Sequence, residues 1–140
     1  MEAIFKLYEG LKRQGPGSKK DTFRALDIIK DKLPKLPRIL DIGCGCGAQT
    51  LDLAEMTDGE ITAVDIYQPF LDNLLERTKH RDLRASIKIL NEDMQKLSFP
   101  KSSFDLIWSE GAIYLMGMEN GLNLWQNFLT IMTSKKSAKH

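Results

Sequence analysis

The stretch Arg38-Ile-Leu-Asp-Ile-Gly-Cys-Gly-Cys-Gly-Ala-Gln-Thr50 combines an apolar run, three alternating glycines and the start of a helix-forming segment. The apolar run is typical of a strand that is buried on both faces of a parallel sheet. Glycines let the backbone take positive φ and approach a ligand closely. A helix starting near Ala48 would point its free N–H groups at the same place. The stretch therefore predicts a nucleotide-type pocket at the carboxyl end of a strand.

The spacing of the glycines separates two classes of cofactor. A dinucleotide-binding turn has the pattern G-x-G-x-x-G, which leaves the helix N-terminus open to a pyrophosphate. Gly43, Gly45 and Gly47 instead form G-C-G-C-G, and Asp41 precedes them. A carboxylate at the mouth of the turn repels a pyrophosphate but attracts an ammonium or sulfonium group. The pattern favours a cationic ligand and disfavours the rival reading, a nicotinamide oxidoreductase.

A second acidic residue ends the next apolar run. Residues 61–64 are mostly β-branched and predict a buried strand, and Asp65 follows it, 22 residues after Gly43. A βαβ unit places its ribose-binding carboxylate about 20 residues after the glycine turn, and a carboxylate can accept two hydroxyl protons at once. A helix N-cap ahead of Pro69 is the alternative. The strand-end position favours ribose binding.

The run Ile39-Leu-Asp-Ile-Gly-Cys-Gly-Cys-Gly47 resembles motif I of the class I S-adenosylmethionine-dependent methyltransferases, and later landmarks follow that family's order. The resemblance extends from about Gln14 to Phe128. It implies an α/β fold, namely a Rossmann-like, doubly wound parallel sheet with strand order 3-2-1-4 and N-terminal helices. It also implies S-adenosylmethionine as cofactor and methyl transfer by in-line displacement.

The resemblance assigns roles to residues at successive strand ends. Asp41 and the glycine turn would hold the methionine end of the cofactor, Asp65 the ribose, and Asp93 with Met94 the adenine. The residues implied to contact the cofactor are Asp41, Gly43, Gly45, Gly47, Asp65, Ile66, Asp93, Met94 and Ser109. Those implied to face the acceptor are Glu110, Tyr114 and Tyr8; Glu110 is the one candidate base, and Tyr114 fits a packing role equally well. The residues after the expected strand 104–108 do not contain the sequence Asn/Asp-Pro-Pro-aromatic. Its absence favours a small molecule as the methyl acceptor.

Apolar periodicity predicts the remaining elements. Helices are expected over about residues 2–13, 21–33, 48–56, 70–84 (with the charged run 76–84 as its solvated end) and 119–132, and further strands over 87–90 and 104–108. Asp21 is a plausible N-cap, and Phe23, Leu26, Ile29 and Leu33 would form the buried stripe of the second helix. The N-terminal segment could fold over the ligands or simply cover the sheet, with Tyr8, Gln14 and Ser18 as the residues of interest.

The chain is expected to be one domain, 1–140, with a helical lead-in (1–37), a core (38–132) and a polar tail (133–140). Members of the resembling family continue with three more strands, so strand 4 is expected to form a long apolar edge. Truncation of the chain explains this best, with self-association through the edge as a consequence; completion of the sheet by another chain is the alternative. An inactive cofactor-binding or regulatory half domain is the alternative function.

The composition of the chain gives no argument for several classes of partner and ligand. A net charge of +1 gives no argument for nucleic acid or an anionic membrane, and no apolar run approaches the roughly 20 residues of a membrane span. The N-terminus lacks a signal-peptide layout, so a cytoplasmic location is expected. Cys44 and Cys46 are too close in sequence for an unstrained disulfide in a tight turn. With only His80 and His140 besides, no metal site is expected.

Overall fold

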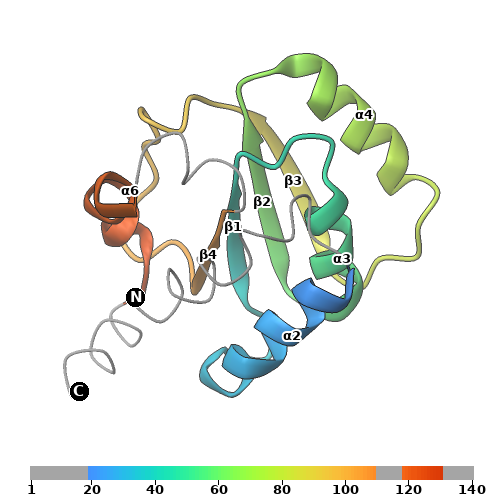
Figure 1. Ribbon diagram of the computed structural model, residues 1–140, viewed down its shortest axis with the longest axis horizontal. Helices are drawn as coiled ribbons and strands as arrows, with labels where there is room; N and C mark the ends of the chain where they lie inside the picture. Colours follow the sequence, from blue (N-terminus) through green and yellow to red (C-terminus); the bar gives the residue numbers. More distant parts are fainter. Residues whose placement is uncertain (1–18, 110–117, 131–140) are drawn as a thin grey trace.

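The computed structural model describes residues 19–109 and 118–130 (Figure 1). The helix expected over residues 2–13 and the polar tail lie outside these residues. No helix in the two described ranges is both long and apolar enough to cross a membrane.

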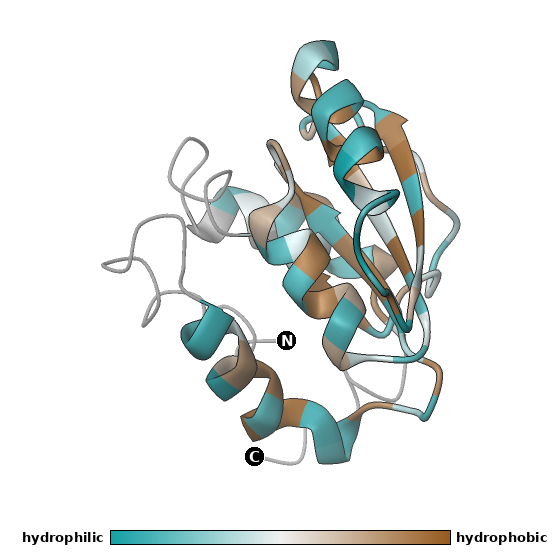
Figure 2. Cartoon of the chain, turned by 90° about the vertical axis from the view of Figure 1, so that its right-hand side faces the viewer, coloured by the Kyte–Doolittle hydropathy of each residue, from teal (hydrophilic) through white to brown (hydrophobic). Residues whose placement is uncertain are grey.

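A four-stranded, all-parallel sheet forms the centre of the molecule, in the order β3-β2-β1-β4. Its strands are β1 (Arg38–Ile42), β2 (Glu60–Asp65), β3 (Ser86–Asn91) and β4 (Leu106–Trp108). Hydrophobic residues make up much of these strands (Figure 2). The predicted Rossmann-like α/β fold and its strand order are confirmed.

Helices cover both faces of the sheet. On one face lie α2 (Lys19–Ile29), which continues into the 3-10 turn η2 (Lys30–Lys32), α3 (Ala48–Met56) and α4 (Gln68–Thr78). On the other lie α6 (Met118–Trp125) and the 3-10 turn η3 (Gln126–Phe128) (Figure 1). Because all four strands are parallel, their carboxyl ends meet at one edge, where the loops leading to the helices begin.

The predicted buried stripe of α2 is partly wrong. The helix already includes Lys19 and Lys20, so Asp21 lies in its first turn and is not an N-cap. Its buried residues are Thr22, Ala25, Leu26 and Ile29, whereas Phe23 is 54% exposed. One residue corresponds to a 100° rotation about a helix axis, so Phe23 lies at the border of the buried side, where it lines a cavity together with Met56 of α3.

The predicted end of the last helix is wrong as well. Helical structure stops at Phe128, and Leu129 has extended backbone that pairs in parallel with Phe104. The Phe104 N–H donates to the Phe128 carbonyl at 2.8 Å, and the Thr130 N–H donates to the Phe104 carbonyl at 2.9 Å. These ladder bonds outweigh the helical periodicity of the side chains.

The outer edge of the sheet is therefore shorter than expected. Strand β4 has three residues, and Leu129 already pairs beside its start. The segment after β3 also covers the adjoining face, because it adds Met94, Leu97 and Phe99 to the core under α6. The Phe99 ring meets those of Phe104 and Phe128 edge-on, with centroids 5.0 and 5.5 Å apart. Self-association through this edge remains a prediction.

An ion-pair cluster ties α2 and α3 to the segment after α4. Glu55 accepts hydrogen bonds from Lys19 Nζ at 2.7 Å and from Arg81 Nε at 3.0 Å. Arg81, followed by Lys19, holds the pKa of Glu55 down at about 2. Because this pKa lies below its unfolded value, the pairing stabilises the fold above about pH 4.5, and the contribution is lost as the pH falls towards 2.

We expect Glu55→Gln to lower the free energy of unfolding by about 1 kcal/mol at pH 7, since the pairs are partly exposed and screened. The difference from the parent protein should shrink at pH 3, as measured by urea denaturation at both pH values. Glu76→Gln removes an exposed pair between the last turn of α4 and Lys79 and is the matched control, expected to have no measurable effect. An equal loss for Glu55→Gln at both pH values would contradict this account.

Candidate functional site

The glycine turn joins β1 to α3 and has the positive φ angles that its sequence predicts. Gly43, Gly45 and Gly47 have φ of 71°, 58° and 87°. The N–H groups of Gly43 and Cys44 both donate to the Val64 carbonyl, at 2.9 and 3.0 Å, which fixes the turn against the end of β2. The first helical bond of α3 runs from the Leu51 N–H to the Gly47 carbonyl. The N–H groups of the first turn of α3 therefore have no acceptor within the helix and face the loop.

Gly45 and Gly47 are required for different reasons. A Cβ on Gly47 would lie 2.2 Å from Cδ1 of Leu74, a fully buried side chain of α4. A Cβ on Gly45 would meet no atom within 4 Å. Gly47 thus permits close packing of α4 against the turn, whereas Gly45 leaves open space beside the backbone that a ligand can enter.

Asp65 lies at the end of β2 and contacts the glycine turn. Its Oδ2 accepts the Gly45 N–H at 2.9 Å, and its Oδ1 accepts the Tyr67 N–H at 2.9 Å. A carboxylate offers about four acceptor positions, so two remain for other donors. The alternative prediction, a helix N-cap, does not describe these contacts, because the N-cap of α4 is Tyr67.

Asp41 lies beneath the turn and not at its mouth as the sequence suggested. Its side chain is fully buried, Oδ2 accepts the Thr50 hydroxyl at 2.5 Å, and Oδ1 has no hydrogen-bond partner. Burial raises the pKa of the Asp41 carboxyl to about 6. The Thr50 hydroxyl and then the Gln49 side-chain amide oppose the rise, and the nearby Asp65 carboxylate adds to it. The site thus holds a buried carboxylate whose charge is incompletely compensated.

The residues after β3 form the next part of the same edge. Asp65 at the end of β2 pairs in register with Asn91 at the end of β3, so Asp93 lies two residues beyond the end of β3. Asp93 Oδ1 accepts the Gln95 N–H at 2.9 Å, which forms a tight turn. The Met94 carbonyl accepts the Trp125 indole N–H at 3.0 Å. This loop is therefore held to α6, a contact that the sequence analysis did not identify.

Two predicted residues lie at the ends of β2 and β4. Ile66 is 66% exposed directly after Asp65. Ser109 is buried, and its Oγ has no hydrogen-bond partner. The predicted acceptor-facing residues Tyr8, Glu110 and Tyr114, and also Gln14 and Ser18, lie outside the described residues.

The cysteines pack within the turn. Both thiols are free, Cys44 is buried, and burial raises the pKa of its thiol. The Cys44 carbonyl accepts Gln49 Nε2 at 3.2 Å, and the Cys46 carbonyl accepts Arg77 Nη1 at 3.0 Å. Arg77, which comes from α4, is a supporting residue that the sequence analysis missed, because nothing in a charged helix end indicates which carbonyl it reaches.

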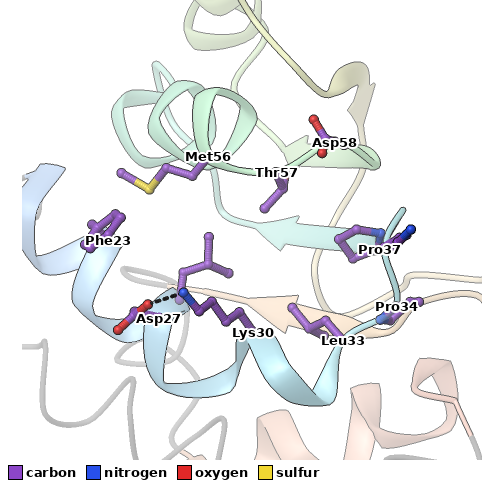
Figure 3. Close-up of a pocket in the computed structure, with 11 residues that line it drawn as sticks. Phe23, Asp27, Lys30, Leu33, Pro34, Pro37, Met56, Thr57 and Asp58 are labelled. Atoms are coloured by element: carbon purple, nitrogen blue, oxygen red, sulfur yellow. Dashed lines mark ion pairs between the residues drawn. The ribbon is translucent and has the colours of Figure 1, made fainter.

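A cavity of about 230 Å³ lies at the other end of the sheet (Figure 3). It opens where η2 leads into β1 and where α3 leads into β2, near Leu33, Pro37 and Thr57. Asp27 and Lys30 form an ion pair of 2.7 Å at its rim. None of the residues predicted to bind the cofactor lines this cavity. It lies at the amino ends of β1 and β2, away from the glycine turn.

Comparisons with known proteins agree with this architecture. A sterol 24-C-methyltransferase of Neurospora crassa is 29% identical over 83 residues, covering 59% of the chain and 22% of that protein. A 27-O-demethylrifamycin SV methyltransferase of Amycolatopsis mediterranei is 28% identical over 97 residues, covering 68% of the chain and 36% of that protein. The chain thus spans well under half the length of these relatives.

A solved structure shares the fold. A SAM-dependent methyltransferase from Aquifex aeolicus superimposes with a TM-score of 0.60 at 15% identity, covering 81% of the chain and 68% of that protein. The sequence profile of a methyltransferase domain matches residues 39–134, from β1 through the last described strand pairing. The chain belongs to the class I methyltransferase-domain family, whose members use S-adenosylmethionine.

Proposed function

We propose that the chain binds S-adenosylmethionine across the carboxyl ends of β1, β2 and β3 and transfers its methyl group to a small-molecule acceptor. The observation that carries the proposal is the hydrogen bond from the Gly45 N–H to Asp65 Oδ2, beside the open space at Gly45. This bond joins the glycine turn to the carboxylate at the end of β2. Asp65 still has acceptor positions that a ligand can use.

The described residues fit the parts of the cofactor. Asp65 can accept the ribose hydroxyls, exposed Ile66 can cover one side of the adenine, and the Asp93–Met94 turn can contact its edge. Asp41, buried with one free oxygen, has the charge to attract the cationic end. The cofactor supplies an already activated methyl group when it is bound.

The protein therefore has mainly to align the acceptor and exclude water. Good alignment alone can supply roughly 7 to 11 kcal/mol of the barrier. A general base is needed only for an acceptor that must lose a proton. Glu110 stays the proposed base, with Tyr114 and Tyr8 proposed to face the acceptor within a single domain of residues 1–140.

Calorimetric titration with S-adenosylhomocysteine tests the proposal. We expect one binding site per chain, no detectable binding of NADH, and release of S-adenosylhomocysteine when S-adenosylmethionine is mixed with a panel of small-molecule acceptors. Binding without transfer to any acceptor would favour the alternative, a cofactor-binding domain without catalysis. Binding of NADH in preference to S-adenosylhomocysteine would overturn the proposal.

A further inference from the structure

Polar atoms at the carboxyl ends of β1 and β4 are buried without a hydrogen-bond partner. They are Oδ1 of Asp41, Nε1 of Trp108 and, on the next residue, Oγ of Ser109. The three residues are 0%, 5% and 1% exposed. An unpartnered buried polar group destabilises the fold and is rare in folded proteins. Such atoms at adjacent strand ends indicate a site that a ligand completes.

Asp41 and Trp108 are direct neighbours in the sheet. They are paired in register between β1 and β4, so their side chains lie on the same face. Two residues earlier on these strands, Ile39 and Leu106 pair and pack in the core under α2 and α3. Neighbouring residues on one face of the sheet therefore carry an unpartnered carboxylate oxygen, Oδ1 of Asp41, and an unpartnered neutral donor, Nε1 of Trp108.

The start of α3 adds positive potential to this place. Thr50, in the first turn of α3, donates to the other oxygen of Asp41 at 2.5 Å, which brings the helix N-terminus next to the carboxylate. N–H groups at a helix N-terminus favour an anion. The site therefore offers one anionic acceptor beside a neutral donor and a helix N-terminus. This combination complements a zwitterion that carries an ammonium and a carboxylate on one carbon.

We propose that Asp41 and Trp108 together bind the amino-acid end of the cofactor, with Asp41 Oδ1 accepting from its ammonium and the Trp108 indole N–H donating to its carboxylate. This inference rests on the proposed function and adds to it a binding residue, Trp108, that no sequence motif indicates. Trp108 selects for an intact amino-acid group on the ligand.

The indole N–H signals report this contact in the unaltered protein. The chain has two tryptophans, Trp108 and Trp125, so a ¹⁵N–¹H spectrum contains two indole signals, which Trp125→Phe assigns. We expect S-adenosylhomocysteine to shift the Trp108 signal. Decarboxylated S-adenosylhomocysteine and 5′-methylthioadenosine, which lack the carboxylate, should leave it in place. A Trp108 signal that moves equally with all three ligands, or with none, would overturn the assignment.

Calorimetry on variants gives a second test. Trp108→Phe keeps an aromatic ring and removes the hydrogen-bond donor. It should lower the affinity for S-adenosylhomocysteine about tenfold and leave the affinity for 5′-methylthioadenosine equal to that of the parent protein. Trp125→Phe is the matched control: it removes an indole that already donates to Met94 and should leave the ratio of the two affinities unchanged. An unchanged ratio in Trp108→Phe would refute the contact.

The two proposals fail in different ways. If the parent protein binds neither S-adenosylhomocysteine nor 5′-methylthioadenosine, the proposed function is wrong and the assignment of Trp108 falls with it. The other outcome is that both ligands bind the parent, the Trp108 indole signal does not distinguish ligands with and without the carboxylate, and Trp108→Phe leaves the ratio of the two affinities unchanged. In that case only the assignment of Trp108 is wrong.

Discussion

Replacing Asp65 by asparagine is expected to weaken binding of S-adenosylhomocysteine by about thirtyfold or more. Hydrogen bonds to a charged group contribute roughly 1.5–3 kcal/mol each, and a carboxylate at the end of β2 can accept from both ribose hydroxyls at once. The amide keeps the size of the side chain but has one acceptor oxygen and no charge. Calorimetric titration of the parent and the variant measures the difference.

The control for Asp65→Asn must remove one negative charge away from the site. Asp82→Asn does so at an exposed position after α4, and should leave the affinity unchanged. Asp65 also accepts the N–H groups of Gly45 and Tyr67, so thermal unfolding must show that the variant keeps its fold. A folded Asp65→Asn protein that binds the ligand as tightly as the parent would remove the ribose assignment.

Gly47→Ala is expected to lower the free energy of unfolding by about 3 kcal/mol. A residue with a Cβ pays roughly 1–2 kcal/mol to adopt φ near +87°. The new Cβ would also lie 2.2 Å from Cδ1 of Leu74, which is fully buried and has little room to move, and overpacking typically costs 1–3 kcal/mol more. Urea denaturation of the parent and the variant gives the value.

Gly45→Ala separates packing from ligand access in the same turn. Its φ of 58° is also left-handed, but its Cβ would meet no atom within 4 Å. The free energy of unfolding should therefore fall only by the cost of the left-handed backbone conformation, about 1–2 kcal/mol. The affinity for S-adenosylhomocysteine should fall markedly, because the methyl group takes the open space beside Asp65. Equal losses of stability in the two variants would contradict the roles given to these glycines.

The sheet could be predicted because its signals are local. The run Ile39–Ile42, the three glycines and Asp65 determine a strand, a turn and a second strand within one short segment, and the strand order 3-2-1-4 follows from right-handed crossovers. The G-C-G-C-G spacing indicated the family correctly. These features depend on the backbone conformation of neighbouring residues, which the sequence specifies directly.

The features that the sequence did not predict depend on contacts with residues from distant segments of the chain. The helical spacing of Trp125, Phe128 and Leu129 predicted one long helix, but Leu129 pairs with Phe104, 25 residues earlier. Asp41 was expected at the mouth of the turn, yet Thr50 and the packing of α3 bury it. Arg77 gave no signal, because its role arises from the Cys46 carbonyl that the folded chain places beside it. The role proposed for Trp108 depends on its register with Asp41, which only the sheet reveals.

A crystal structure of the chain with S-adenosylhomocysteine is the most direct measurement of the central claim. The account predicts one ligand across the carboxyl ends of the strands, with its ribose on Asp65, its adenine against Ile66 and the Asp93–Met94 turn, and its amino-acid end between Asp41 and Trp108. A ligand bound elsewhere, such as in the cavity near Leu33 and Pro37, with Asp65 and Asp93 contacting none of it, would contradict the account.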